Sequence, residues 1–266
     1  MADVDIEIKG QPETISALTF KATVVDAIDL LREYDSAISG VLSGSLSWYL
    51  SQLSTTPNIL IGFRSRVKPV RRFASRVDDF GPTVTHSLVS GLDTLERQGK
   101  TPPYLSVGGM ERVQHLASLI GKNGATGFRV RADKNVVDVT QATIDNVRKL
   151  LPVKRTSIGS VEGKLEGINL HGKSRVIIYR AINNKAVTCD FAPDRFMERV
   201  KELLGRRVVA FGTLHKNVNG DTLRVTMERI ESAENVGLLP REQWPDPDFA
   251  QALSTAEYIR RIRGGG

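Results

Sequence analysis

The residues best suited to chemistry form a dense basic run at 64–76, written Arg-Ser-Arg-Val-Lys-Pro-Val-Arg-Arg-Phe-Ala-Ser-Arg. It holds six cations and no acid in thirteen residues. Cations at this density can follow a phosphate backbone, and Phe73 is available to stack on a base. The run predicts a nucleic-acid contact made by Arg64, Arg66, Lys68, Arg71, Arg72 and Arg76. Docking on an acidic protein, or a solvated loop balanced by Asp78 and Asp79, are the alternatives.

Residues of other types that commonly catalyse reactions or bind metals are not spaced as a catalytic or metal-binding motif requires. The four histidines form neither His-x-x-x-His nor His-Glu-x-x-His, so no metal site is expected. Cys189 is expected to face inward from a strand, and no Gly-x-Ser-x-Gly elbow is present. Solvated strand edges explain the N-terminal carboxylates more simply than a divalent-metal site assembled from Asp3, Asp5, Glu7, Asp26 or Asp29. We therefore expect a non-enzymatic protein without a cofactor.

A glycine pair at 121–127 offers a second nucleic-acid hypothesis. Gly121-Lys-Asn-Gly124 is similar to the Gly-x-x-Gly loop of KH domains, which clamps a nucleic-acid backbone. That loop leads into a helix, whereas residues 127–131 alternate like a strand. A helix end followed by a tight turn explains these glycines more simply.

Composition limits the class of protein. The chain has 266 residues, a net charge of +7 and one cysteine, and its pI is about 9.6. One cysteine excludes an intramolecular disulfide framework. No apolar run is long enough to span a membrane, and the acidic N-terminus does not resemble a secretory signal. We expect a cytoplasmic protein of one large or two ordinary domains.

Residues 1–157 mix two periodicities. Val4, Ile6 and Ile8 alternate with acids and predict a strand, as does the alternation around Trp48 and the apolar run 58–63. Helical stripes are expected near 24–38, 84–95, 113–120 and 144–151, with glycines ending three of them. This pattern predicts an α/β or α+β domain to which no named fold can be assigned.

Residues 158–232 read as strand, strand, strand, helix, strand, strand. The first strand, 160–170, changes the face of its apolar residues at Gly167, which predicts a β-bulge. Strands at 175–180 and 186–191 follow. Pro193 then begins a helix that ends at Gly205. Strand four, 207–214, is joined to strand five by an Asn-Gly hairpin at 217–221.

This order resembles the OB-fold, a small five-stranded barrel. The resemblance rests on the bulged strand around Gly167, on Ala186-Val-Thr-Cys-Asp-Phe191 and on Gly205-Arg-Arg-Val-Val-Ala-Phe-Gly-Thr-Leu214. It implies that single-stranded nucleic acid binds across strands two and three, flanked by two loops. The implied contacts are Lys173, Arg175, Tyr179 and Lys216, with Tyr179 exposed for stacking. Phe191 and Phe211 are expected inside the barrel.

Residues 233–266 are predicted to be a Pro-rich tail followed by a short basic helix. Taken together, the sequence predicts an α+β chain that is a nucleic-acid-associated binding protein, using an OB-like barrel and a basic loop. The alternative is a protein–protein regulator, such as an antitoxin-like or accessory subunit of a nuclease, toxin or defence complex. In either case a protein partner is expected, and no membrane.

Overall fold

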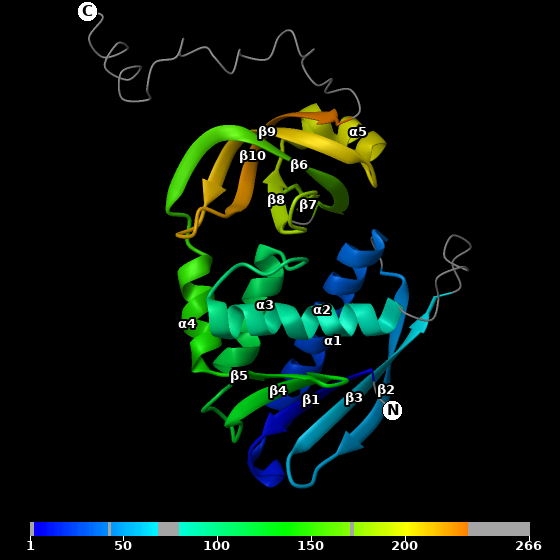
Figure 1. The fold of residues 1–266 in the computed structure, drawn as a ribbon, viewed down its shortest axis with the longest axis vertical. Helices are drawn as coiled ribbons and strands as arrows, with labels where there is room; N and C mark the ends of the chain where they lie inside the picture. The colour runs from blue at the N-terminus through cyan, green and yellow to red at the C-terminus, as the bar shows by residue number, and fades with distance from the viewer. Residues whose placement is uncertain (1–2, 42–43, 69–79, 171–172, 234–266) are drawn as a thin grey trace, which may run out of the picture.

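The computed structural model describes residues 3–41, 44–68, 80–170 and 173–233. The helices of the N-terminal half lie between two bodies of β-structure, an open sheet below and a barrel above (Figure 1). The mixed α+β class expected from the sequence is confirmed. The tail 233–266 lies outside the described residues, apart from Ala233, and so do Arg71, Arg72 and Arg76 of the basic run. No helix in the described ranges meets the length and apolarity needed to cross a bilayer.

The open sheet has the order β2-β3-β1-β4-β5, and every neighbouring pair runs antiparallel. Of the two arrangements that the sequence left open, this is the α+β one. Alternate residues of β1, Val4, Ile6 and Ile8, are buried beneath the helices. Their neighbours therefore face solvent. The strands are β1 (Val4–Lys9), β2 (Leu46–Ser54), β3 (Ile59–Val67), β4 (Gly127–Ala132) and β5 (Asn135–Val139).

Helices cover one face of this sheet and leave the other open. Side-chain oxygens cap three helices: Ser16 accepts from Thr19, Ser106 from Gly109, and Thr140 from Ala142. The helices are α1 (Ala17–Ser39), α2 (Phe80–Asp93), α3 (Val107–Ser118) and α4 (Gln141–Leu150), with short turns η1 (Pro12–Thr14) and η2 (Thr94–Gln98).

The second body is a closed barrel with the order β10-β8-β7-β6-β9. The register shifts between Leu165 and Gly167, so the bulge expected at Gly167 is present. The strands are antiparallel neighbours except β8 and β10, which are parallel. Its elements are β6 (Arg155–Asn169), β7 (Arg175–Arg180), β8 (Ala186–Asp190), α5 (Pro193–Leu203), β9 (Arg207–Lys216) and β10 (Thr222–Ser232).

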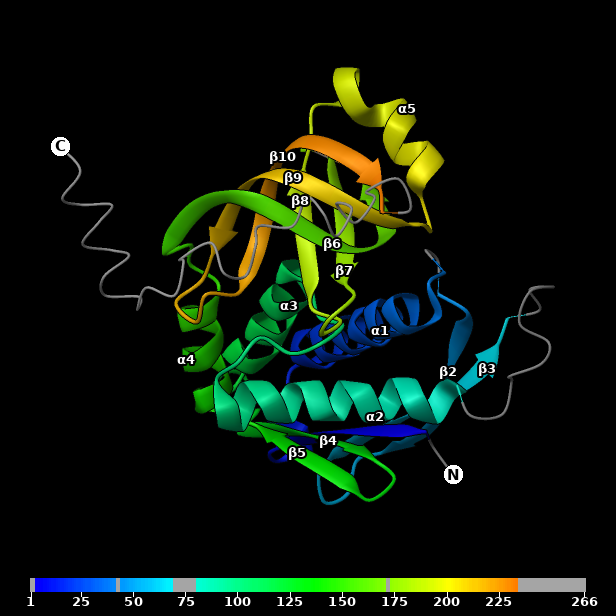
Figure 2. The same cartoon turned by 45° about the horizontal axis from the view of Figure 1, so that its top comes forward.

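Two barrel hairpins hold the barrel on the helices (Figure 2). In the β7–β8 turn, the carbonyl of Asn184 accepts from the Tyr104 amide at 2.8 Å, and its side-chain amide donates to the Tyr104 hydroxyl at 2.8 Å. In the β9–β10 turn, Asn217 donates to Thr101 at 3.2 Å. Leu223 of β10 packs into the core of the N-terminal half. The barrel face that includes β7 and β8 is thereby turned toward α1 and α3.

Candidate functional site

The first candidate surface is the open face of the sheet at the end of β3. Arg64 is paired with Tyr49 of β2 in the antiparallel register. The Arg66 guanidinium lies 4.9 Å from the centre of the Tyr49 ring, which is a cation–π distance. Both arginines are exposed, and Tyr49 is 49% exposed. Among the described residues Arg66 makes no ion pair with an acid. We call Tyr49, Arg64 and Arg66 the β3 patch.

Two basic residues elsewhere on the same face, Lys9 and Arg129, are neutralised. Asp138 receives hydrogen bonds from Arg129 and Lys9, each at 2.8 Å. The Arg129 hydrogen bond is the main reason that the pKa of Asp138 falls to about 2. Glu7 adds a second acid 3.8 Å from Arg129. Arg66 of the β3 patch therefore differs from Lys9 and Arg129, because among the described residues it makes no ion pair with an acid.

Lys68 continues the predicted run beyond β3. Its ammonium donates to the Gly44 carbonyl at 3.0 Å, and its amide donates to the Ser45 carbonyl at 2.8 Å. These bonds fix the first residue after the strand beside the β3 patch. The remaining predicted contacts of the run, Arg71, Arg72 and Arg76, fall outside the described residues.

The exposure expected for Tyr179 is wrong. Its side chain lies in a small apolar cluster with Ala37 of α1 and Ala186 of β8, and only 7% of it is exposed. Burial raises the pKa of Tyr179, and the charges of Glu33 and Glu166 raise it further. A base cannot stack on this ring while the barrel is docked, because the N-terminal half covers it.

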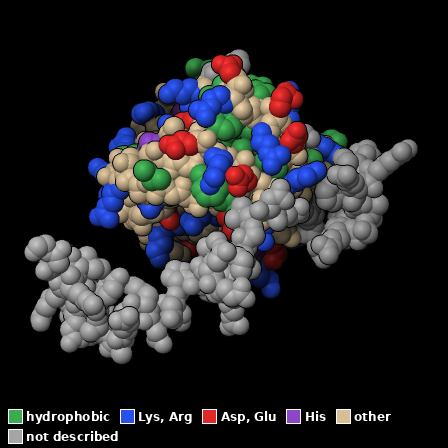
Figure 3. Space-filling view, turned by 90° about the horizontal axis from the view of Figure 1, so that it is seen from above, with side chains coloured by type: hydrophobic (Ala, Val, Ile, Leu, Met, Phe, Trp, Pro, Cys, Tyr) green, Lys and Arg blue, Asp and Glu red, His purple; other side chains and the backbone are tan. Residues whose placement is uncertain are grey.

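The other barrel cations expected from the resemblance do not form one surface. Lys173 is exposed, directly after two residues outside the description. Arg175 on β7 is 3.2 Å from Asp190. Lys216 ends β9, beside the turn that contacts Gly99 and Thr101. On the visible barrel end, basic and acidic side chains are interspersed (Figure 3). Some are paired, as in Lys201–Glu198 at 2.8 Å.

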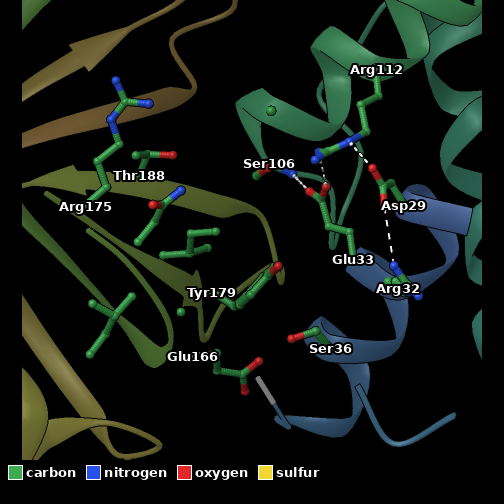
Figure 4. Close-up of a pocket in the computed structure, with 15 residues that line it drawn as sticks. Asp29, Arg32, Glu33, Ser36, Ser106, Arg112, Glu166, Arg175, Tyr179 and Thr188 are labelled. Carbon is green, nitrogen blue, oxygen red and sulfur yellow. Dashed lines mark hydrogen bonds and ion pairs between the residues drawn. The ribbon is translucent and has the colours of Figure 1, made fainter. Parts of the chain in front are cut away.

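A second candidate site is a cavity of about 460 Å³ where the barrel faces α1 and α3 (Figure 4). Arg32 and Arg112 line it from the helices, and Arg175 lines it from β7. Their ion pairs are long: Arg32 is 3.8 Å and Arg112 3.4 Å from Asp29. Charge-assisted hydrogen bonds are normally about 2.7–2.9 Å. The guanidinium donors around this cavity are therefore only partly satisfied.

Two buried carboxylates line the same cavity. Glu33 accepts the Ser106 amide at 2.6 Å, at the N-terminus of α3, and burial raises its pKa. Glu166 is 5% exposed and contacts Lys164 at 2.7 Å through Oε1. Its Oε2 is buried and has no hydrogen-bond partner among the described residues. Burial likewise raises the pKa of Glu166. The sequence did not single out either residue, since only folding brings them together.

The remaining candidates have structural explanations. No group of three or more His, Cys, Asp or Glu suited to a metal occurs in the part of the chain described. Asp26 instead contacts His115 Nδ1 at 2.6 Å. Cys189 is fully buried, which raises the pKa of its thiol. A Cβ on Gly124 would lie 2.3 Å from the Thr14 carbonyl, so close backbone packing requires that glycine.

Sequence reasoning missed two aromatic contacts. The Tyr49–Arg66 pair depends on the register between β2 and β3, although strand alternation had placed Tyr49 on the polar face. Phe191 is buried as expected. Phe211, also expected inside the barrel, is instead only half-buried, and the Arg229 guanidinium lies 4.2 Å from its ring centre. Arg229 also forms an ion pair with Glu231 at 3.4 Å, so its positive charge is partly neutralised.

Comparison with known proteins assigns no family. No family model matches the chain, and no curated protein matches it. The Arg66–Tyr49 stack of the β3 patch and the polar cavity beneath the barrel are therefore the features on which a function can be based.

Proposed function

We propose that the chain is a non-enzymatic nucleic-acid-binding protein that holds a single strand against the β3 patch. The observation that carries this proposal is the Arg66 guanidinium stacked 4.9 Å over Tyr49, beside Arg64 on an open sheet face. A cation and an exposed aromatic ring side by side suit a phosphate and its neighbouring base. In the sequence, the basic run continues directly after this strand, and its further cations could neutralise additional phosphates.

We also propose that the barrel is an OB-fold used here mainly for docking. The supporting features are the strand order, the bulge in β6, the parallel β8–β10 pair and the position of α5 between β8 and β9. In OB-folds the surface across strands two and three commonly binds single strands. Here that surface faces α1. We therefore assign the binding of single-stranded nucleic acid to the open sheet and not to the barrel.

A protein regulator is the second candidate function, and the edge strand β2 favours it. Within β2, which contains no charged residue and no proline, Leu50 is 61% and Leu53 52% exposed. An uncharged edge with exposed apolar side chains can pair with a strand of another protein. A partner bound there would cover Tyr49 as well, so the two functions would compete for one surface.

Fluorescence anisotropy with labelled single-stranded DNA and RNA tests the first proposal. Substituting Arg64→Gln together with Arg66→Gln should weaken binding and make the slope of log K against log salt shallower by about 1.4, since each phosphate contact contributes about 0.7. Tyr49→Ala should cost about 1–3 kcal/mol, the usual value for one stacked base.

Lys9→Gln is the matched control, because Lys9 lies on the same sheet face but is neutralised by Asp138. It should leave the affinity nearly unchanged. If the intact protein retains neither oligonucleotide at 50 mM salt, or if the arginine variants bind as tightly as Lys9→Gln, the proposal is wrong. Copurification of a stoichiometric protein whose release follows Leu50→Asp would support the regulator instead.

A further inference from the structure

The cavity between barrel and helices has two chemically different walls. On the helix wall, the guanidinium groups of Arg32 and Arg112 lie beside Asp29 and Glu33, whereas Arg175 lines the space from β7 on the barrel side, with its guanidinium directed away from those two (Figure 4). Each has an acid nearby, yet the pairs span 3.2–3.8 Å and none is a hydrogen bond among the described residues. The buried Nε of Arg175 has no hydrogen-bond partner among the described residues, although it lies 3.2 Å from Asp190 Oδ1. These groups retain donors for an anion, and the planar guanidinium fork suits phosphate oxygens.

The opposite wall offers an acceptor. Glu166 is more than nine-tenths buried, and its Oε2 has no hydrogen-bond partner in the described residues. Lys164 satisfies only Oε1. A buried carboxylate oxygen without a donor is costly, so a ligand N–H reaching it would be favourable. Figure 4 shows the carboxylate directed into the space toward Ser36 on α1.

Size and apolar surface narrow the ligand class. About 460 Å³ lies within the range of small-molecule sites, which occur preferentially at domain interfaces. Ile168 and Ile177 contribute apolar lining next to the Glu166 wall. A flat ring with N–H groups fits between such side chains and the carboxylate, while an attached anion reaches the arginines.

We propose that this cavity binds a nucleoside phosphate, with the phosphate on Arg32 and Arg112 of the helix wall and a base N–H on Glu166 of the barrel wall. The site is separate from the β3 patch and does not depend on the proposed function. Because both halves of the molecule supply contacts, a bound nucleotide would hold the barrel and the helices together. Binding would then raise the thermal stability of the whole chain.

Calorimetric titration of the full chain with AMP, GMP, CMP, UMP and inorganic phosphate tests this site. At least one nucleotide should bind at micromolar to low millimolar concentration, and inorganic phosphate should bind at least tenfold more weakly. Arg32→Gln should weaken the nucleotide at least tenfold. Arg32 is an exposed residue at the cavity wall, so the variant should keep its fold and its melting temperature.

Two further variants make the outcome specific. Glu166→Gln should change the relative affinities of the four bases while leaving phosphate binding unchanged. Lys216→Gln, a barrel cation outside the lining, should change nothing. The site does not exist if no nucleotide binds at 5 mM, if phosphate equals every nucleotide, or if Arg32→Gln has no effect. Arg64→Gln separates the two proposals, because it should weaken the binding of single-stranded nucleic acid but not the binding of a nucleotide.

Discussion

Glu166 places a carboxylate between the barrel and α1, where water reaches little of it. Burial raises its pKa above the ordinary 4.5, and the hydrogen bond from Lys164 opposes that rise. A raised pKa in the folded state means that the stability gained by keeping the group neutral is fully present below pH 4.5. That stability is lost as the pH rises through the folded pKa.

Glu166→Gln should therefore stabilise the protein at neutral pH and make little difference at pH 4. The glutamine keeps the shape of the side chain and an oxygen for Lys164 without the cost of a buried charge. Urea denaturation of both proteins between pH 4 and pH 8 measures this. Glu228→Gln, on an exposed residue of β10, is the control. A difference in unfolding free energy that does not grow with pH would contradict the argument.

Among the elements, β9 and β10 approach each other closely at Gly212. Its φ is +154°, and an added Cβ would lie 2.0 Å from the Thr226 carbonyl oxygen of β10. Gly212→Ala should cost about 3 kcal/mol, because the two strand backbones must separate. Chemical denaturation gives the value.

Gly127→Ala in β4 is the matched substitution within a strand, since its Cβ would meet only the Lys9 side chain at 3.5 Å. Gly127→Ala should lower the free energy of unfolding much less than Gly212→Ala does. Equal losses of stability in the two variants would show that the close approach at Gly212 is unimportant to the barrel.

The elements also show what a sequence can predict. Period-2 alternation identified β1 and β2, and the change of face at Gly167 located the bulge, because these signals are local. Neither β5 nor the sheet order was predicted, since pairing depends on contacts between distant residues. Tyr179 illustrates the same limit. Alternation indicates which face of a strand a residue occupies, but not whether another domain covers that face.

For the candidate sites, the sequence identified charged residues but not which of them are paired with acids or which site each of them lines. Arg64 and Arg66 were predicted from density alone, whereas their distinction from Lys9 and Arg129 follows from the acids that fold beside the latter. Arg175 was predicted to contact single-stranded nucleic acid, and it is found in the wall of the cavity. Glu166 and Arg32 gave no sequence signal, because they lie far apart in the chain.

At the scale of the whole molecule, Tyr179 joins the two halves. Tyr179→Ala should cost about 3 kcal/mol, as expected for removing a buried ring, and should loosen the docking. Hydrogen exchange should then accelerate in the loop around Tyr104 and at the end of α1 near Ala37. Tyr104→Phe removes only the hydroxyl bonded to Asn184 and should cost about 1 kcal/mol. Unchanged exchange across this interface in Tyr179→Ala would show that the ring is not needed for docking.

Leu223 has a consequence for how the chain is made. It belongs to the core of the N-terminal half but lies in the last hairpin of the barrel, far along the chain. A ribosome releases the N-terminal residues first, so a nascent chain exposing only the first 150 residues lacks this part of its core. Ribosome-bound chains in which residue 150 has just emerged should resist protease less than chains in which residue 232 has emerged. Completion of the first half would thus wait for synthesis of the second.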